Sequence, residues 1–290
     1  MSEPQKSKSE LKHVIDLYLS KASPEPVSSS SAPKKNNSKS QVVSFLVPFD
    51  EQLSFILNSA VASHLSQYAE SCYLATNFPS ENERVLLESS SLFSKRDYFS
   101  LAENKSSVTI SPNFYWVSCS NQKNISEPNS LDSEENSSDL VSNSLIVTDL
   151  FKNFNLGCET MVRVLDHVVL MIKPEVEDLK NAYKIIKACQ YINRDLDVSL
   201  IFNTSISNQL VENIFSHFSD IVSQHLAYPI RCLGNFHLDI AGGKFPEKEL
   251  KQINWDSIVY PKIPKTDSGS VGSLEQIRFL RNLKNVLGDN

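Results

Sequence analysis

Short apolar runs alternate with stretches of helical spacing through the middle of the chain. Val42–Val47 is almost continuously apolar, and the apolar positions between Leu53 and Tyr68 then recur at i, i+3, i+4 and i+7 spacing. Continuous apolar runs are typical of parallel strands that are covered on both faces. The pattern therefore predicts an α/β fold in one domain: a doubly wound, mostly parallel sheet of about seven strands with helices on both faces. The other expected strands are Cys72–Thr76, Phe114–Ser118, Ser144–Asp149, His167–Ile172, Val198–Phe202 and Ile230–Leu233, and the other expected helices contain Leu179–Cys189 and Gln209–Gln224.

Three polar stretches divide the chain. Residues 1–40 are rich in Ser, Pro, Asn and Lys and offer little to bury, so we expect them to be mostly disordered. Residues 121–143 read as an acidic surface insertion within the domain 41–260, and residues 261–272 read as a linker. We expect the last part of the chain, 273–290, to form a separate amphipathic helix.

Composition excludes several classes of protein. The formal net charge of −6 is atypical of a nucleic-acid-binding surface, so no nucleic-acid partner is expected. No apolar run approaches the roughly 18 residues of a membrane span. The cysteines are widely spaced and the histidines form no cluster, which predicts a cytosolic protein with reduced thiols and no metal site. The five cysteines are Cys72, Cys119, Cys158, Cys189 and Cys232.

Glycine usage excludes one kind of active site. The chain contains seven glycines, and the first is Gly157, so the turn after the first strand has none. A phosphate-binding loop needs glycines there, because they allow consecutive backbone N–H groups to turn toward the phosphate. That turn instead carries Asp50 and Glu51; at about 4 Å and an effective dielectric near 20, one such charge and a phosphate charge repel by about 4 kcal/mol. No catalytic residue is predicted elsewhere, since no nucleophile motif occurs.

The second half of the chain, from about residue 140 to 240, resembles the MinD/FlhG branch of the ParA-type P-loop ATPases. Lys173-Pro174-Glu175 and the helix that follows, with Ala182-Tyr183 and Ile186-Lys187, resemble a Pro-Glu and Asp-Ala-Tyr…Ile-Lys pattern of that family. Val198–Asn203 resembles a strand that ends in an adenine-contacting Asn. Leu233–Asp239 resembles its Leu-Gly-x-Ile-Pro-x-Asp, with His237 in place of the proline. The resemblance implies a MinD/ParA-like sheet and a role in positioning division sites, flagella or similar assemblies.

The same resemblance indicates two remaining nucleotide-site residues. Asp149 falls at the Walker B aspartate and Asn203 at the adenine-contacting Asn, while Asp166 falls at an Ala-Asp pair. The Lys-Gly-Gly-x-Gly-Lys-Ser/Thr loop of the family is missing, and after the second strand only Thr76 and Asn77 stand where it keeps an aspartate. We therefore expect neither ATP hydrolysis nor a bound cofactor. Left open are a metal-binding or merely capping role for Asp149 and a purine-contacting or merely structural role for Asn203.

The expected C-terminal helix is apolar on one side and basic on another. Following a linker, it is similar to the membrane-targeting helix that ends MinD-type proteins, and its peripheral contact would be with the inner face of the cell membrane. The alternative is a last helix packed on the domain itself. The residues concerned are Leu274, Ile277, Arg278, Phe279, Leu280, Arg281, Leu283, Lys284, Val286 and Leu287.

A second amphipathic helix is expected at residues 9–19. A tethered helix of this kind commonly docks in the groove of a partner, and FlhG-type proteins carry a partner-activating segment in this place, although its motif is not reproduced here. Folding back on the same chain is the alternative. Its apolar side consists of Leu11, Val14, Ile15, Tyr18 and Leu19.

Together these features predict a non-catalytic pseudo-ATPase. It would act as an adaptor or regulator in the positioning or assembly of a bacterial surface structure such as a flagellum, pilus, secretion or division apparatus. Its expected partners are proteins, either an intact ATPase of the same type or another partner of that family. One alternative is a nucleotide switch whose atypical pocket uses Asp149 and Asn203. The other is an α/β enzyme of unrelated function.

Overall fold

The computed structural model of this protein describes one α/β domain. The expected helix 9–19, the insertion 121–143 and the linker 261–272 lie outside the described residues. The described residues are 40–48, 50–76, 107–119, 144–149, 158–237, 250, 251, 253, 255, 258 and 279.

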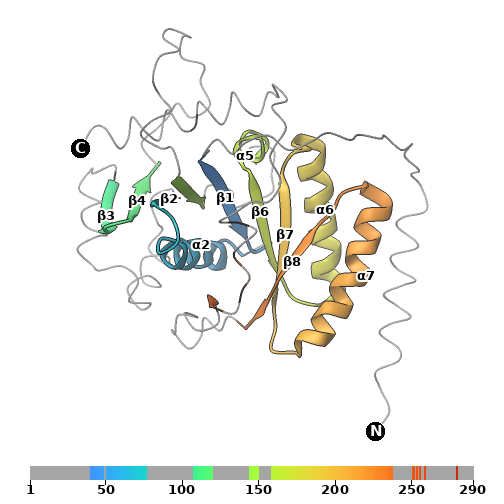
Figure 1. Ribbon diagram of the computed structural model, residues 1–290. Helices are drawn as coiled ribbons and strands as arrows, with labels where there is room; N and C mark the ends of the chain where they lie inside the picture. Colours follow the sequence, from blue (N-terminus) through green and yellow to red (C-terminus); the bar gives the residue numbers. More distant parts are fainter. Residues whose placement is uncertain are drawn as a thin grey trace, which may run out of the picture.

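Eight strands form a single sheet in the order β3-β4-β2-β5-β1-β6-β7-β8 (Figure 1). Neighbouring strands are parallel, except that β3 pairs antiparallel with β4. The strands are β1 (Gln41–Leu46), β2 (Ser71–Thr76), β3 (Ser107–Ser111), β4 (Phe114–Ser118), β5 (Ser144–Thr148), β6 (His167–Ile172), β7 (Asp197–Asn203) and β8 (Arg231–Phe236). The predicted mostly parallel, doubly wound sheet is confirmed.

The sheet has one strand more than the seven expected, because β3 forms a hairpin with β4. Pro112 and Asn113 lie in the turn between the two strands, and the backbone N–H of Cys72 donates to the carbonyl of Asn113. Unlike the buried central strands, β3 is at the edge of the sheet and only partly covered. An edge strand needs no continuous apolar run, so the apolar pattern alone does not reveal it.

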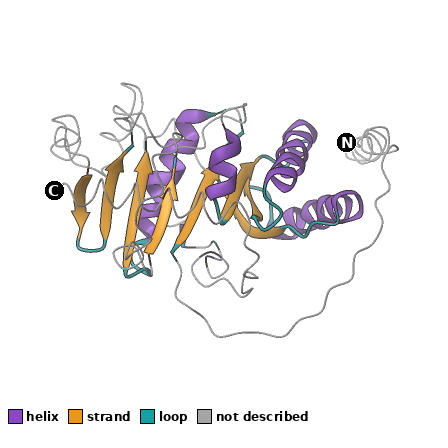
Figure 2. Ribbon diagram, turned by 90° about the horizontal axis from the view of Figure 1, so that it is seen from above, coloured by secondary structure: helices purple, strands orange, loops and turns teal. Residues whose placement is uncertain are grey.

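The described helices lie on both faces of the sheet. Figure 1 shows α2 beside the first strands and α6 and α7 beside the last ones, and Figure 2 shows the strands in one row with helices flanking it. Contacts place α2 against β1, β2 and β5, α6 against β6, and α7 against β8, while α5 contacts α6. The helices are α2 (Glu51–Leu65), α5 (Cys158–Val164), α6 (Val176–Ile192) and α7 (Asn208–Leu226).

Residues that follow β8 complete the core on the α2 face. Leu250, Ile253, Trp255 and Ile258 are buried in the apolar cluster that also contains Phe45 and much of α2. The Trp255 ring meets the Phe45 ring edge-on, with centroids 5.9 Å apart, and its Nε1 donates to the carbonyl of Leu250 over 2.7 Å. This face of the sheet is therefore covered both by α2 and by chain from beyond the last strand.

Within the described part of the chain, no helix has the length and apolar character that crossing a bilayer demands.

Candidate functional site

The winding of the sheet identifies one crevice as the place where a ligand would bind. From β1 the chain passes through α2 to β2, which lies toward the β3 end of the sheet. From β5 it passes through α5 to β6, which lies toward the β8 end. The neighbours β1 and β5 are therefore followed by connections that leave in opposite directions. In open α/β sheets, ligands bind at the carboxyl ends of two such strands.

The side chain of Asn58 lies in this place, between the carboxyl ends of β1 and β5. Pairing between β1 and β5 ends at Val43, beyond which β1 continues to pair only with β6. At Phe45 the amide of Asn58 takes the place of the missing strand: its Oδ1 accepts from the Phe45 N–H over 2.9 Å, and its Nδ2 donates to the Phe45 carbonyl over 2.6 Å. Asn58 is 1% exposed. Beyond the paired residues, β1 is therefore bonded to the side chain of Asn58 from α2, and its Ser44 hydroxyl donates to the Thr148 carbonyl of β5 over 2.9 Å.

The same amide reaches Asp149 at the end of β5. Asn58 Nδ2 lies 2.7 Å from the Ser54 carbonyl and 3.3 Å from Asp149 Oδ1. The Asn58 nitrogen carries two hydrogens but has three acceptors: the carbonyls of Phe45 and Ser54 and the carboxylate of Asp149. The contact with Asp149 is the longest of the three and therefore the weakest. Asp149 itself is buried, and its backbone N–H donates to the carbonyl of Ala75 on β2. The residue predicted to be a remnant of a Walker B site therefore lies in the crevice, against Asn58.

The turn before α2 is short and satisfied internally. Four residues, Val47 to Asp50, connect β1 to α2, whereas a G-x-x-x-x-G-K loop spreads its glycines and lysine over about seven positions. Asp50 is the N-cap: its Oδ1 accepts from the Leu53 N–H over 2.9 Å. The hydroxyl of Ser54 accepts from the Val47 N–H over 2.8 Å and donates to the Asp50 carbonyl over 2.9 Å. The N–H groups of Val47, Asp50 and Leu53 are thus bound to the protein's own oxygens.

Replacing the N-cap tests how much this turn depends on Asp50. Asp50→Ala should lower the free energy of unfolding by about 1 kcal/mol, because the Leu53 N–H loses its acceptor at a helix end. Asp50→Ser is the matched control and should stay close to the unchanged protein, since serine is an equally good N-cap residue. Urea unfolding measures both; equal losses in the two variants would contradict a capping role.

The other residues that the sequence connects with a nucleotide lie away from Asp149 or are hydrogen-bonded to other parts of the protein. Asn203 ends β7, and β1 and β6 lie between it and β5, which is a lateral separation of about 14 Å from Asp149. Asp166 lies at the amino ends of the central strands, opposite to the site, where its Oδ2 accepts from the Val42 N–H over 2.9 Å. Thr76 is buried and its Oγ1 accepts from Nε1 of Trp116 over 2.8 Å. Asn77 lies outside the described residues.

The part of the chain that the structure describes holds no metal centre, and two of its cysteines are inert. No three His, Cys, Asp or Glu side chains there are grouped so as to hold a metal ion. Burial raises the pKa of Cys72 and raises that of Cys119 to about 12, so both thiols stay protonated at neutral pH. These two side chains therefore behave as apolar core residues.

Sequence reasoning missed Ser54 and Asn58, the residues that close the crevice. A signal was present: they are four residues apart on the predicted helix, so both polar side chains lie on the same side of it. Asparagine is disfavoured inside helices unless its amide finds partners. An Asn in the middle of the first helix therefore indicated a polar contact of its amide, although the sequence does not give the partner.

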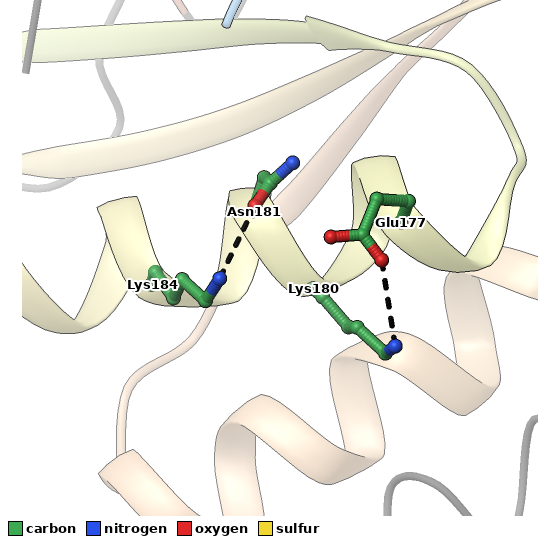
Figure 3. Close-up of polar contacts among 4 residues, drawn as sticks. All are labelled: Glu177, Lys180, Asn181 and Lys184. Carbon is green, nitrogen blue, oxygen red and sulfur yellow. Dashed lines mark hydrogen bonds and ion pairs between the residues drawn. The ribbon is translucent and has the colours of Figure 1, made fainter.

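The outer face of α6 is exposed and polar. Lys180 pairs with Glu177 over 3.4 Å, and Lys184 donates to Oδ1 of Asn181 over 3.4 Å (Figure 3). Tyr191, which follows Lys184 along the same side of the helix, is 90% exposed. Exposed pairs of this kind contribute little to the stability of the protein. The side chains on this face of α6 can therefore serve another function.

One residue of the expected C-terminal helix is described. Phe279 is helical, is 3% exposed and belongs to the apolar cluster on the face covered by α5, α6 and α7. The rest of the residues expected in this helix lie outside the described part, as do all those of the N-terminal helix. Burial of Phe279 favours the second of the two alternatives, a last helix that packs on the domain.

No protein-family model matches this sequence, and no curated protein matches it. Several solved structures are similar to it in fold. MinD of Aquifex aeolicus is 14% identical over 84% of this chain and 97% of its own, with a TM-score of 0.44. A plasmid partition protein of Borrelia burgdorferi is 13% identical over 74% and 96%, with a TM-score of 0.45, and the cell division ATPase MinD of Pyrococcus furiosus is 13% identical over 85% and 99%, with a TM-score of 0.42. At these identities the similarity concerns the fold alone.

Proposed function

We propose that this chain is a non-catalytic relative of the MinD/FlhG-type ATPases. It acts as an adaptor or regulator in the positioning or assembly of a bacterial cell-surface structure, such as a flagellum, pilus, secretion or division apparatus. The observation that carries the proposal is the position of Asn58, whose amide is bonded to Phe45 and Asp149 in the crevice where a doubly wound protein holds its ligand.

The short turn between β1 and α2 supports the same proposal. A polyphosphate needs a cradle of free backbone N–H groups and a neutralising lysine. In this chain the Leu53 N–H is bonded to the Asp50 carboxylate and the Val47 N–H to the Ser54 hydroxyl. An incoming phosphate would have to displace a negatively charged group of the protein itself, which electrostatics opposes.

A role in binding follows from the resemblance to this family, in which dimers form around sandwiched ATP. Without a phosphate loop, this chain does not form that dimer. It either pairs with an intact ATPase of this type or binds a partner of the family through a surface that does not depend on nucleotide. Tyr191 on α6 is a suitable contact, since exposed aromatic side chains are common anchors of protein interfaces.

Co-expression with an intact ATPase of this type tests the pairing. Tyr191→Ala should reduce co-purification at least several-fold while leaving the unfolding midpoint unchanged, because the side chain is almost fully exposed. Lys184→Ala, on the same side of α6, is the control for a general effect of altering this helix. Undiminished co-purification of the Tyr191 variant would remove α6 from the interface, and no co-purification of the unchanged chain would contradict the pairing.

Isothermal titration of the full chain with ATP and Mg²⁺ tests the loss of the nucleotide site. We expect no binding up to millimolar nucleotide, in the unchanged protein and in Asp149→Asn alike. Micromolar binding that Asp149→Asn abolishes would overturn the proposal and establish the alternative, a nucleotide switch with an atypical pocket.

A further inference from the structure

Two cations flank the exposed ring of Tyr191 at the end of α6. Lys187 lies one turn before Tyr191 on the same side of the helix, about 6 Å along its axis, and Arg194 lies in the turn that follows the helix. Both cations are exposed, and Tyr191 is 90% exposed. We call these three residues the Tyr191 patch.

The two cations of the patch take part in no ion pair with another residue that the structure describes. Lys180 and Lys184, nearer the start of the same helix, differ from them. Lys180 pairs with Glu177, and Lys184 donates to the side chain of Asn181 (Figure 3). A cation near a helix C-terminus can complement the helix dipole, but that effect is confined to the last turn, and the last turn of α6 contains no basic residue. The dipole therefore does not account for the charge of Lys187.

The patch is held in place by the helix and by the turn after it. The inner side of α6 is buried through Leu179, Ala182, Ile185, Ile186 and Cys189. In the turn, Asn193 Nδ2 donates to the carbonyls of Val162 and Leu165 over 3.0 and 3.2 Å. The Oδ1 of Asn193 accepts from the Asp195 N–H over 3.1 Å, so Arg194 lies between two residues that are bonded to each other. A partner that binds here needs to order little of this chain, which favours affinity.

The chemistry of the patch fits a protein segment that carries carboxylates. Its two cations attract negative charge, and the Tyr191 ring between them offers the apolar contact that anchors many protein interfaces. A bilayer or a nucleic acid is also anionic, but such an extended partner meets the field of the whole chain, whose formal net charge is −6. A short acidic segment avoids most of that repulsion because it touches only the patch.

We propose that the Tyr191 patch binds an acidic segment of a partner protein. Carboxylates of the segment lie against Lys187 and Arg194, and an apolar side chain lies against the Tyr191 ring. Lys184 lies two turns before Tyr191, about 10 Å along the helix axis, and is outside the patch. The inference rests on the proposed adaptor role, for which it names the chemistry of the partner.

Fluorescence anisotropy with the purified full chain tests this binding. The probe is a fluorescein-labelled peptide of twelve residues that repeats Glu-Glu-Leu, and the control peptide repeats Gln-Gln-Leu. At about 0.15 M salt, where exposed charges act only over about 8 Å, we expect the acidic peptide to bind at least about 10-fold more tightly than the control. Tyr191→Ala should weaken binding of the acidic peptide about 10-fold, as expected of an aromatic anchor.

Two double variants separate the patch from the net charge of the chain. Lys187→Gln combined with Arg194→Gln should weaken binding of the acidic peptide about 10-fold. Lys180→Gln combined with Lys184→Gln removes the same charge from the same helix and should weaken it less than about 2-fold. Because these side chains lie at the surface, the unfolding midpoint should stay the same in both variants.

Four results would overturn the proposal: no binding of the acidic peptide at millimolar chain, equal binding of the two peptides, equal losses in the two double variants, or an unchanged affinity in Tyr191→Ala. Sedimentation with phosphatidylglycerol vesicles that the first double variant abolishes would also overturn it, since the patch would then bind a membrane. The result is separate from co-purification with an intact ATPase. Peptide binding through the patch without co-purification would contradict the proposed pairing but support this inference, and co-purification without peptide binding would do the reverse.

Discussion

Asn58→Ala should lower the free energy of unfolding by about 3–4 kcal/mol, far more than the loss of a polar side chain on the surface costs. The substitution leaves the N–H and the carbonyl of Phe45 without partners at a place where β5 has already moved away from β1. Each buried polar group left unsatisfied costs about 1–3 kcal/mol. Urea unfolding of the purified chain measures the loss.

Ser59→Ala is the matched control for this prediction. Ser59 is the next residue on α2 and is equally buried, but its hydroxyl has no hydrogen-bond partner among the residues that the structure describes. Removing it should change the free energy of unfolding by less than about 0.5 kcal/mol. If Asn58→Ala proved as mild as Ser59→Ala, the amide would not be the group that closes the crevice.

Trp255→Ala should destabilise the protein by about 3–5 kcal/mol, the range for truncating a large buried aromatic side chain. Trp255 is packed against Phe45 of β1 and lies 6.0 Å from the ring of His64, so its loss opens a cavity between the sheet and the last turn of α2. Thermal or urea unfolding should show one cooperative transition at a lower midpoint.

Tyr68 provides the control for Trp255. Its ring contacts the same histidine at 5.7 Å, but it is 51% exposed. Tyr68→Ala should therefore cost less than about 1 kcal/mol. An unfolding midpoint that Trp255→Ala leaves in place would mean that the residues after β8 are not part of the cooperative core.

The sheet could be predicted because its central strands are buried on both faces. Val42–Val47 and His167–Ile172 have almost no polar position, and short apolar runs of this kind indicate buried parallel strands when helices of regular spacing follow them. The edge strand Ser107–Ser111 and the seven-residue helix Cys158–Val164 were not predicted. An edge strand is solvated on one side and a short helix has little periodicity, so neither leaves a clear apolar pattern.

The candidate site was predicted only in part. The apolar pattern placed Asp149 at the end of a strand and the resemblance to the MinD/FlhG branch connected it with a site; the structure places it at the carboxyl end of β5, next to Asn58. What stands opposite it was out of reach, because Asn58 is 91 residues away in sequence and its contacts depend on where β1 and β5 part. Periodicity indicates that a helix covers a sheet but not which polar side chain enters a gap between strands.

Steady-state ATP hydrolysis by the purified full-length chain tests most directly whether the nucleotide site has been lost. The measurement compares the unchanged protein with Asp149→Asn in the presence of Mg²⁺. We predict that phosphate release stays at the background of buffer without protein in both samples. Turnover by the unchanged chain that disappears in Asp149→Asn would contradict the account.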